Sequence, residues 1–318
     1  MMISVVMPAY NASKFIAQAI ESILEQTFHN LELIVVDDGS TDNTREIVAR
    51  YIKLDKRVRL ILNDHSGICH ALNTGIQAAK YPWIARMDAD DIALPERFEK
   101  QMKAANTYPN VVVWGSYVQH INSKGEILSL QAVGPLTEEE SYSLIQKGDI
   151  PYVIHPTWII KKEIFWQAGF YDPKFPLAQD VEIMSRIAHY GSIVVIPEPL
   201  LLYRVHSESS SMKKFFAQLR MMEWAIARHK ARLAGTQIPD FNQFIAQEKQ
   251  QPIWLRLTRN ITKFTRYCYR KAGLLVADKQ HLQAGLYLGI CLVCNPAYGI
   301  SRLWAQKMSP TARRLMAN

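Results

Sequence analysis

Asp88, Asp90 and Asp91 are the side chains in this sequence whose type and spacing most directly suggest chemistry. They follow an apolar stretch at residues 81–85, and Pro95 after them suits the first turn of a helix, so they occupy the carboxyl end of a predicted strand. Open α/β sheets place ligands at that edge. Carboxylates this close repel one another unless a cation or a donor-rich ligand neutralises them, and Mg²⁺ or Mn²⁺ bridging to phosphate oxygens is a common solution. The alternative is an acidic loop in contact with solvent.

The elements that must position these aspartates form an alternating pattern. Short apolar runs predict buried strands at residues 3–7, 31–36, 58–62, 83–87 and 111–118. Helical spacing of apolar residues predicts helices at residues 13–26, with Ser13 as the N-cap, and at about 42–53, 67–79 and 95–106. The connections are long enough for parallel crossovers, so the pattern predicts an α/β fold with a mostly parallel, Rossmann-like sheet flanked by helices.

The pattern weakens after residue 118. Thr137 predicts the N-cap of a helix that reaches about residue 147, Gly169 ends a short helix at 164–168, and Asp180 opens an amphipathic helix bounded by Gly191. Residues 193–196 and 200–203 predict two closing strands. The sequence contains no G-x-G-x-x-G after the first strand and no G-x-x-x-x-G-K-[ST], which disfavours dinucleotide binding and a P-loop.

Charge divides the chain into two unequal parts. Residues 1–212 contain 19 Lys or Arg and 25 Asp or Glu, a net charge of −6, whereas residues 213–318 contain 18 and 4, a net charge of +14. From residue 213 onward the apolar residues recur only at helical intervals. The sequence therefore predicts a globular domain at 1–212 and a basic helical region at 213–318. That charge suits an anionic membrane surface, an acidic partner or nucleic acid, and charge alone does not choose among them.

Two further features bear on the compartment. Residues 282–300 form the most apolar stretch, but it includes Gln283, Asn295 and Pro296, which favours a packed or interfacial helix over a membrane-spanning one. The four cysteines form no secreted disulfide framework, and the N-terminus lacks the basic segment and apolar core of a cleavable signal. We expect a cytoplasmic protein, with the region 213–318 as its contact with the inner face of the membrane or with a second copy of the chain.

Several motifs in order along the chain resemble one known family. They lie at residues 5–11 (VVMPAYN), 33–42 (LIVVDDGSTD), 85–91 (ARMDADD), 155–156 (HP), 169–172 (GFYD), 179–180 (QD) and 203–206 (YRVH). Together they resemble a family 2 glycosyltransferase with the GT-A fold, over about residues 2–211. Agreement of this many ordered motifs is more specific than any one of them. The region 213–318 carries no part of the resemblance.

The resemblance implies a metal-dependent enzyme that transfers a sugar from a nucleotide diphosphate to an acceptor hydroxyl, with inversion at the anomeric carbon. It implies that Pro8, Tyr10 and Asp38 hold the base and ribose, and that Asp88 contacts the ribose or a metal-bound water. A carboxylate can accept a hydrogen bond from a uracil ring nitrogen, and Tyr10 could stack on the base. For Asp37, a helix-capping or loop-bracing role is equally open.

A divalent ion, Mn²⁺ or Mg²⁺, would neutralise the charge that develops on the departing diphosphate. The resemblance implies that Asp90 and His206 bind this ion and that Arg204 contacts the diphosphate. Arg204 and His206 could equally brace the loop after the closing strand. We expect Asp91 to cap the helix that begins near Pro95 rather than to bind the ion.

The resemblance implies that Asp180 is the catalytic base that removes the acceptor proton. Gln179 stands where many family members have Glu, and loss of that like charge makes Asp180 easier to ionise. The alternative is that Asp180 merely caps its helix. A second departure lies at residues 70–73 (HALN), where many relatives carry an Arg, so one phosphate contact has no assigned residue.

The leading hypothesis is an inverting transferase that uses a nucleotide sugar, with a UDP-sugar favoured, and a glycan or glycolipid acceptor in surface polysaccharide or glycolipid synthesis. A sugar nucleotidyltransferase is an alternative, but it would need a Gly-rich, Lys-bearing triphosphate loop that Tyr10, Asn11 and Ala12 do not provide. A catalytically silent nucleotide-sugar-binding or scaffold protein is another. No nucleic-acid partner is expected, and a homo-oligomer is left open.

Overall fold

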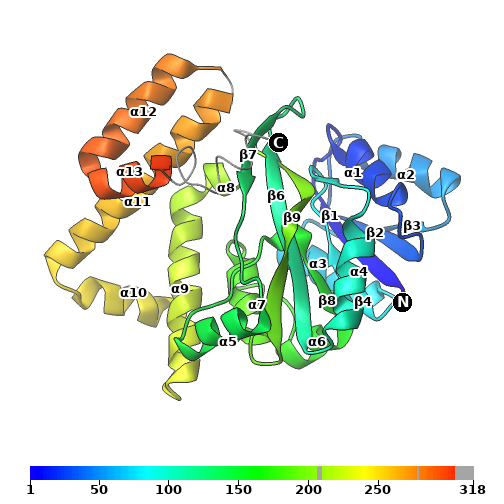
Figure 1. Cartoon of the computed structure of the whole chain (residues 1–318), viewed down its shortest axis with the longest axis horizontal. Coiled ribbons are helices and arrows are strands. Elements are labelled where there is room, and N and C mark those ends of the chain that lie inside the picture. The colour runs from blue at the N-terminus through cyan, green and yellow to red at the C-terminus, as the bar shows by residue number, and fades with distance from the viewer. Residues whose placement is uncertain (206–209, 278, 305–318) are drawn as a thin grey trace.

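The computed structural model describes residues 1–205, 210–277 and 279–304. Its centre is a curled sheet whose hydrogen-bonded strand order is β3-β2-β1-β4-β8-β6-β9-β5, with β7 paired to β6 (Figure 1). The strands are β1 (Ile3–Ala9), β2 (Leu31–Asp37), β3 (Val58–Leu62), β4 (Trp83–Arg86), β5 (Ile92–Ala93), β6 (Val111–Ile121), β7 (Ile127–Gln131), β8 (Ile159–Lys161) and β9 (Ser192–Arg204). This is the α/β, mostly parallel sheet that the sequence predicts.

The N-terminal half of the sheet is parallel. β1 pairs in parallel with β2 on one side and with β4 on the other, and β2 pairs in parallel with β3. β1 and β2 are apolar along nearly their whole length because helices cover both of their faces. The register sets Val6 opposite both Ile34 and Arg86, so the loops that follow β1, β2 and β4 open at one edge of the sheet.

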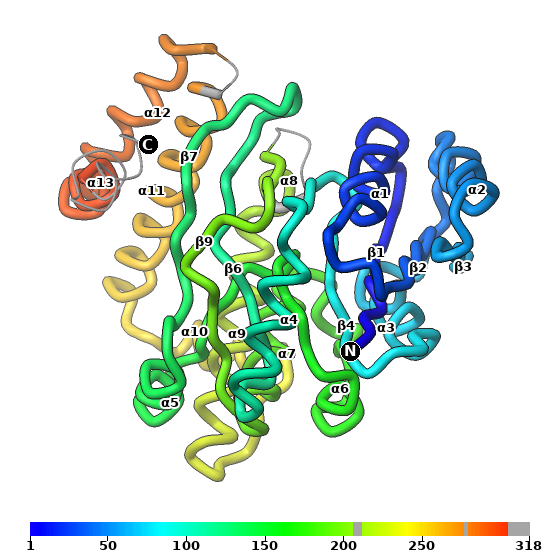
Figure 2. Tube along the Cα trace, turned by 45° about the vertical axis from the view of Figure 1, so that its right-hand side comes forward, coloured from blue at the N-terminus to red at the C-terminus, as the bar shows by residue number. Residues whose placement is uncertain are grey.

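Helices cover both faces of the sheet (Figure 2). Those before the basic region are α1 (Ile16–Leu24), α2 (Thr44–Leu54), α3 (Ile68–Ala78), α4 (Arg97–Thr107), α5 (Glu138–Gln146), the 3₁₀ turn η1 (His155–Thr157), α6 (Lys162–Ala168) and α7 (Gln179–Ile187). One buried cluster joins α1, α2 and α4 to one face, and a second joins α3, α6 and α7 to the other. The core is therefore two apolar layers with the sheet between them.

Close packing of α3 on β1 depends on a glycine. A Cβ built on Gly75 would lie 2.4 Å from a methyl group of Val6. Contact of this kind is shorter than any real Cβ makes, so only glycine permits the observed distance between this helix and the strand.

Three differences from the sequence predictions have physical reasons. The two predicted closing strands are one long strand, β9, whose register against β6 shifts near Pro197 and Pro199, because proline cannot donate to the ladder. β5, β7 and β8 are too short or too polar to show a strand pattern. The predicted N-cap Ser13 is wrong: α1 begins at Ile16, and the backbone N–H of Ser13 donates instead to Asp42.

The basic region is helical, as predicted. It contains α8 (Ser210–Lys213), α9 (Phe215–Leu233), α10 (Phe241–Gln250), α11 (Ile253–Ala277), α12 (His281–Cys294) and α13 (Pro296–Leu303). α9 packs against α7, and the ring of Trp224 stacks on Phe175 with a centroid distance of 4.2 Å. The division at residue 212 stays a prediction, but α9 and α10 share a buried cluster with the sheet domain. Among the described residues, no helix combines the length and apolarity that a bilayer crossing requires.

Candidate functional site

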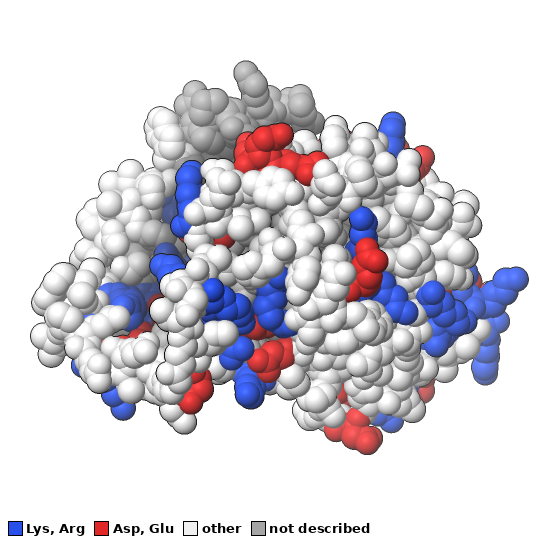
Figure 3. Space-filling view, turned by 90° about the horizontal axis from the view of Figure 1, so that it is seen from below, with Lys and Arg blue, Asp and Glu red and all other residues white. Residues whose placement is uncertain are grey.

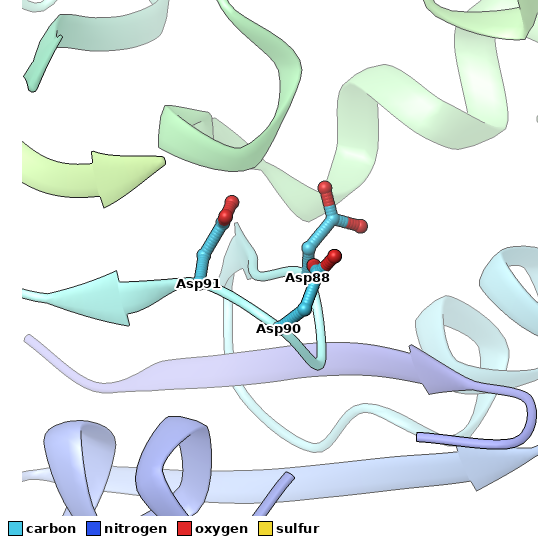
Figure 4. A group of neighbouring side chains, drawn as sticks. All are labelled: Asp88, Asp90 and Asp91. Atoms are coloured by element: carbon cyan, nitrogen blue, oxygen red, sulfur yellow. The ribbon is translucent and has the colours of Figure 1, made fainter. Parts of the chain in front are cut away.

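The acidic loop between β4 and β5 brings three carboxylates together at the carboxyl edge of the sheet. Asp88, Asp90 and Asp91 each offer an oxygen within 4.8 Å of the others. Their side chains project to the same side of the loop, away from β1 and β2, and Asp91 is set somewhat apart from the other two (Figure 4). Concentrated hard oxygen donors of this kind suit a divalent cation such as Mg²⁺ or Mn²⁺.

Arg86 is the buried cation beside this loop. It is the last residue of β4, and its guanidinium forms an ion pair with Asp88. Its Nε and Nη1 are buried and have no hydrogen-bond partner within the described part of the chain. Burial raises the pKa of Asp88, and the charges of Asp90 and Asp180 raise it further, whereas Arg86 acts in the opposite direction.

Asp91 does not have the helix-capping role that the sequence predicted. It does not cap α4, which begins at Arg97 after Glu96, so the capping prediction is wrong. Instead Asp91 is buried, and its Oδ1 accepts from the backbone N–H of Arg204 at 2.8 Å. Its Oδ2 is buried without a hydrogen-bond partner among the described residues, and burial together with Asp90 and Asp88 raises its pKa well above the usual value. A cation at this position would satisfy an oxygen that the protein leaves unpaired.

Arg204, at the end of β9, braces the acidic loop. Its Nε donates to the backbone oxygen of Asp90 at 2.7 Å, Nη1 to that of Asn122 at 3.0 Å and Nη2 to the side chain of Gln18 at 2.9 Å. The bracing alternative therefore agrees with the observed contacts. These bonds use one N–H of each nitrogen, and the contact of Arg204 with a diphosphate stays a prediction. His206, the other predicted metal ligand, lies outside the described residues.

Asp180 lies in the first turn of α7, and the structure brings it close to the acidic loop. Its charge raises the pKa of Asp88, so the two carboxylates lie within electrostatic reach of each other. Burial raises the pKa of Asp180 itself, while hydrogen bonds from the Val181 backbone and from the Tyr152 side chain lower it. The alternative that Asp180 is the N-cap is wrong: Ala178 holds that position, with a left-handed backbone.

The residues predicted to bind the nucleotide lie at the ends of β1 and β2. The backbone N–H of Asp38 donates to Ala9 at 2.8 Å, and its carboxylate accepts from the backbone N–H groups of Ser66 at 2.9 Å and Gly67 at 2.8 Å. The ring of Tyr10 is half exposed and lies against His65, with 4.3 Å between ring centroids. Pro8 belongs to β1. The nucleotide roles of Pro8, Tyr10 and Asp38 stay predictions.

Asp37 has the loop-bracing role that the sequence left open. It is fully buried, and its Oδ2 accepts from Nε of Arg45 at 2.6 Å and from the backbone N–H of Ser40 at 3.3 Å. These bonds hold the turn after β2 in place. They also fix the direction in which the adjacent Asp38 leaves the sheet.

Sequence reasoning gave no role to three residues of this site: Arg86, Tyr152 and Tyr171. Nε2 of His155 lies 2.7 Å from the hydroxyl of Tyr171, and burial, with Arg86 nearby, lowers the pKa of His155 well below the usual value, so the imidazole is neutral. The signal for Arg86 was present in the sequence, because a charged residue at the end of an otherwise apolar strand is rarely buried without a partner. No periodic pattern marks the two tyrosines.

Parallel strands that end at a carboxylate cluster define an α/β protein that binds its ligand at the carboxyl edge of the sheet. Comparison with known proteins then identifies the family. The model of the family "Glycosyl transferase family 2" matches residues 4–169, and the chain belongs to this family. It is 33% identical over 217 residues to an uncharacterized glycosyltransferase of Haemophilus influenzae, covering 66% of this chain and 67% of that protein. It is 35% identical over 225 residues to glycosyltransferase GlyG of Streptococcus pneumoniae, covering 67% and 74%.

Solved structures identify the fold. The crystal structure of S. aureus TarS 1–349 in complex with UDP superposes with a TM-score of 0.56 and 16% sequence identity, covering 97% of this chain and 93% of that chain. TarS 1–349 in complex with UDP-GlcNAc gives 0.57 and 16%, covering 94% and 91%. The predicted GT-A fold and family 2 membership are confirmed.

Proposed function

We propose that this protein transfers a sugar from a nucleotide diphosphate sugar, a UDP-sugar, to an acceptor hydroxyl with inversion at the anomeric carbon. The observation that supports the proposal is the electrostatic proximity of Asp180 to the Asp88–Asp90–Asp91 loop. The charge of Asp180 acts on Asp88, and the charge of Arg86 acts on both Asp88 and Asp180. The UDP and UDP-GlcNAc complexes of the structurally similar TarS support the choice of nucleotide.

Asp180 is the proposed base. In the reaction the acceptor oxygen forms a bond to the anomeric carbon, the bond from that carbon to the phosphate oxygen breaks, and the electron pair leaves with the nucleoside diphosphate. The proton of the acceptor hydroxyl passes to a carboxylate oxygen of Asp180. Burial raises the pKa of this carboxyl from its usual value, which brings it closer to neutral pH and makes it a stronger base.

Asp90 is the proposed direct ligand of Mn²⁺ or Mg²⁺, and Asp88 contacts the ribose or a metal-bound water. The donor set fits: three carboxylates lie within reach of one another, and a buried oxygen of Asp91 lacks a partner among the described residues. A bound divalent ion would neutralise charge on the leaving diphosphate. We retain His206 as a proposed ligand and Arg204 as a proposed diphosphate contact. The bond of Arg204 to the Asp90 backbone also supports the position of Asp90.

Pro8, Tyr10 and Asp38 are the proposed nucleotide contacts. Tyr10 offers a half-exposed ring at the carboxyl edge, and Asp38 is pinned there by two backbone N–H groups. We further propose that the acceptor is a glycan or glycolipid in surface polysaccharide or glycolipid synthesis, and that the protein works at the inner face of the cytoplasmic membrane. The excess of basic residues at 213–318 supports the last point.

The test is to measure UDP affinity by calorimetry and sugar release from UDP-sugars, each with and without Mn²⁺. Asp90→Ala should abolish the Mn²⁺-dependent part of UDP binding. Asp180→Asn should bind UDP with Mn²⁺ as the wild type does, and should lose transfer. Unchanged metal-dependent affinity in Asp90→Ala would remove the metal role, and appreciable turnover in Asp180→Asn would remove the base.

The same experiment separates the catalytically silent alternative. A silent binding protein would bind UDP and Mn²⁺ but release no sugar in the wild type with any donor. A thermal-shift screen of UDP-, GDP- and dTDP-sugars with Mn²⁺ selects the donors to use, because a ligand that binds only the folded chain raises the unfolding temperature.

A further inference from the structure

The last three helices leave apolar side chains facing outward. α12 is an uncharged helix of 14 residues in which Leu282, Leu286 and Val293 are 92%, 65% and 84% exposed. Their spacing of four and seven places all three on one side of the helix. Gly289 lies on the same side, and a Cβ built there would meet nothing within 4 Å. Among the described residues, this side of α12 therefore has no protein neighbour.

The opposite side of α12 is packed. Ala284 and Cys291 are buried, and α12 forms a hairpin with α11. Figures 1 and 2 both place α11 between α12 and the sheet domain, so α12 lies at the outer edge of the molecule. An apolar stripe on the far side of a packed helix has no role in the hairpin's own core.

The two neighbouring helices also expose apolar side chains. Early in α11, Ile253, Leu257 and Ile261 are exposed at helical spacing, as is Trp254 beside them. After α12, Ile300 is exposed on α13. In the view from below, Lys and Arg lie beside Asp and Glu across the middle of the face, with uncharged surface around them (Figure 3).

Charge identifies the occupant. α11, α12 and α13 together contain seven Lys or Arg and no Asp or Glu. Arg259 and Lys263 are paired with Glu248 and Glu223 of neighbouring helices, whereas Arg256, Arg266 and Arg302 have exposed side chains at the surface. A second copy of the same face would bring like charges together, whereas an anionic surface would neutralise them.

We propose that α11, α12 and α13 form a docking surface for an anionic lipid bilayer, with the Leu282–Leu286–Val293 stripe inserted among the lipid headgroups. An apolar stripe with basic flanks on helices that do not span is the arrangement of a helix lying in the membrane interface. Each Lys or Arg near an anionic surface favours binding by about fivefold. The inference rests on the membrane location within the proposed function, but not on its chemistry.

The experiment is sedimentation of the full chain with vesicles of phosphatidylcholine alone or mixed with phosphatidylglycerol. The wild type should bind the mixed vesicles, should bind the neutral ones at least about tenfold more weakly, and should lose affinity as salt rises. Leu286→Glu combined with Val293→Glu should reduce binding to mixed vesicles by more than about tenfold. Leu54→Glu is the matched control: Leu54 is 80% exposed on α2, outside this surface, and its variant should bind as the wild type does.

Two further measurements keep the result decisive. Thermal unfolding and UDP affinity of the double variant should equal those of the wild type. If no protein binds UDP while vesicle binding follows the pattern above, the proposed chemistry fails and the docking surface stands. Equal vesicle binding by wild type and double variant would overturn the docking surface. So would a wild-type dimer in sedimentation velocity that the double variant abolishes without any vesicle binding, since the stripe would then join two copies of the chain.

Discussion

The hydroxyl of Tyr152 is one of the groups that act on the pKa of Asp180, the proposed base. Burial raises the pKa of Asp180, and the bond from the Tyr152 hydroxyl opposes that rise by stabilising the ionised carboxylate. Asp180 must be ionised to accept a proton, so transfer should decline as pH falls through its pKa. The acidic limb of the pH–rate profile therefore reports the pKa of Asp180.

Removing the Tyr152 hydroxyl should move that limb to higher pH. In Tyr152→Phe the ionised form loses a hydrogen bond, so the pKa of Asp180 should rise. The measurement is kcat/KM against pH for wild type and variant. Tyr142→Phe, an exposed tyrosine on α5, is the control and should leave the profile unchanged. A limb that stays in place or moves to lower pH in Tyr152→Phe would contradict the assignment.

Arg86 partly neutralises the negative charge of the acidic loop through its ion pair with Asp88. Arg86→Met removes the partner of Asp88 and leaves three neighbouring carboxylates without this cation, so the free energy of unfolding should fall by about 2 kcal/mol at pH 7. Urea unfolding measures the change. Arg86→Lys should recover part of the loss because it restores the charge.

Saturating Mn²⁺ supplies the second readout for Arg86. If the ion occupies the loop, it should stabilise Arg86→Met more than it stabilises the wild type, since it neutralises the same carboxylates. Equal stabilisation of both proteins would mean that the guanidinium and the ion act on different groups.

At the scale of elements, Gly75 sets the distance between α3 and β1. Gly75→Ala should destabilise the fold by about 1–3 kcal/mol because the added methyl would overlap Val6. Gly273→Ala is its matched control: Gly273 lies in α11 with open space around its Cβ position, so alanine there should stabilise the helix by about 0.5–1 kcal/mol. Denaturant midpoints of the two variants should move in opposite directions, and parallel shifts would contradict the packing argument.

The elements that the sequence predicted best are those with an uninterrupted pattern. β1 and β2 are apolar at nearly every position because both faces are covered, and the helices between the first strands keep a regular apolar spacing. β5 could not be predicted from the sequence, because a strand of two residues is too short to show an alternation of apolar and polar residues. The hydrogen bond between the Arg204 backbone and Asp91 joins residues more than a hundred positions apart, so no local sequence pattern predicts it.

The same distinction holds for the site. The carboxylates stood out because Asp88, Asp90 and Asp91 are clustered in sequence, whereas Tyr152 and Tyr171 enter the site only through the fold. The error on Asp91 has the same origin: its place before Pro95 suggested a local cap, and the competing partner, the backbone of Arg204, lies on β9.

At the scale of the whole molecule, the basic region has two parts: α9 and α10, which contribute to the core, and α11, α12 and α13, which form the proposed docking surface. α9 and α10 bury Trp224 and Phe244 against the sheet domain, whereas α12 lies on the far side of α11 from that domain (Figure 1). A chain cut after residue 251 should keep the cluster and bind UDP. A chain cut after residue 212 exposes Phe175 and removes the partner Arg232 from the buried Glu182, so it should lose about 3 kcal/mol or more of stability.

Circular dichroism melts and UDP calorimetry of the two truncated chains provide the check. Equal stability of the 1–212 chain and the 1–251 chain would show that α9 contributes nothing to the fold. The 1–251 chain should also fail to sediment with anionic vesicles, because it lacks the docking surface.

Glu182 stands two residues after the proposed base on α7, and Arg232 of α9 donates to it at 3.2 Å while donating to Ser185 at 2.9 Å. The family match ends at residue 169, before either helix begins. A chimera that joins the C-terminal region of a relative to the sheet domain of this chain would therefore need a residue equivalent to Arg232 in that region. Without it, the proposed base would lie on a helix that lacks one of its contacts, so a chimera designed to change the proposed location should also change the rate of transfer.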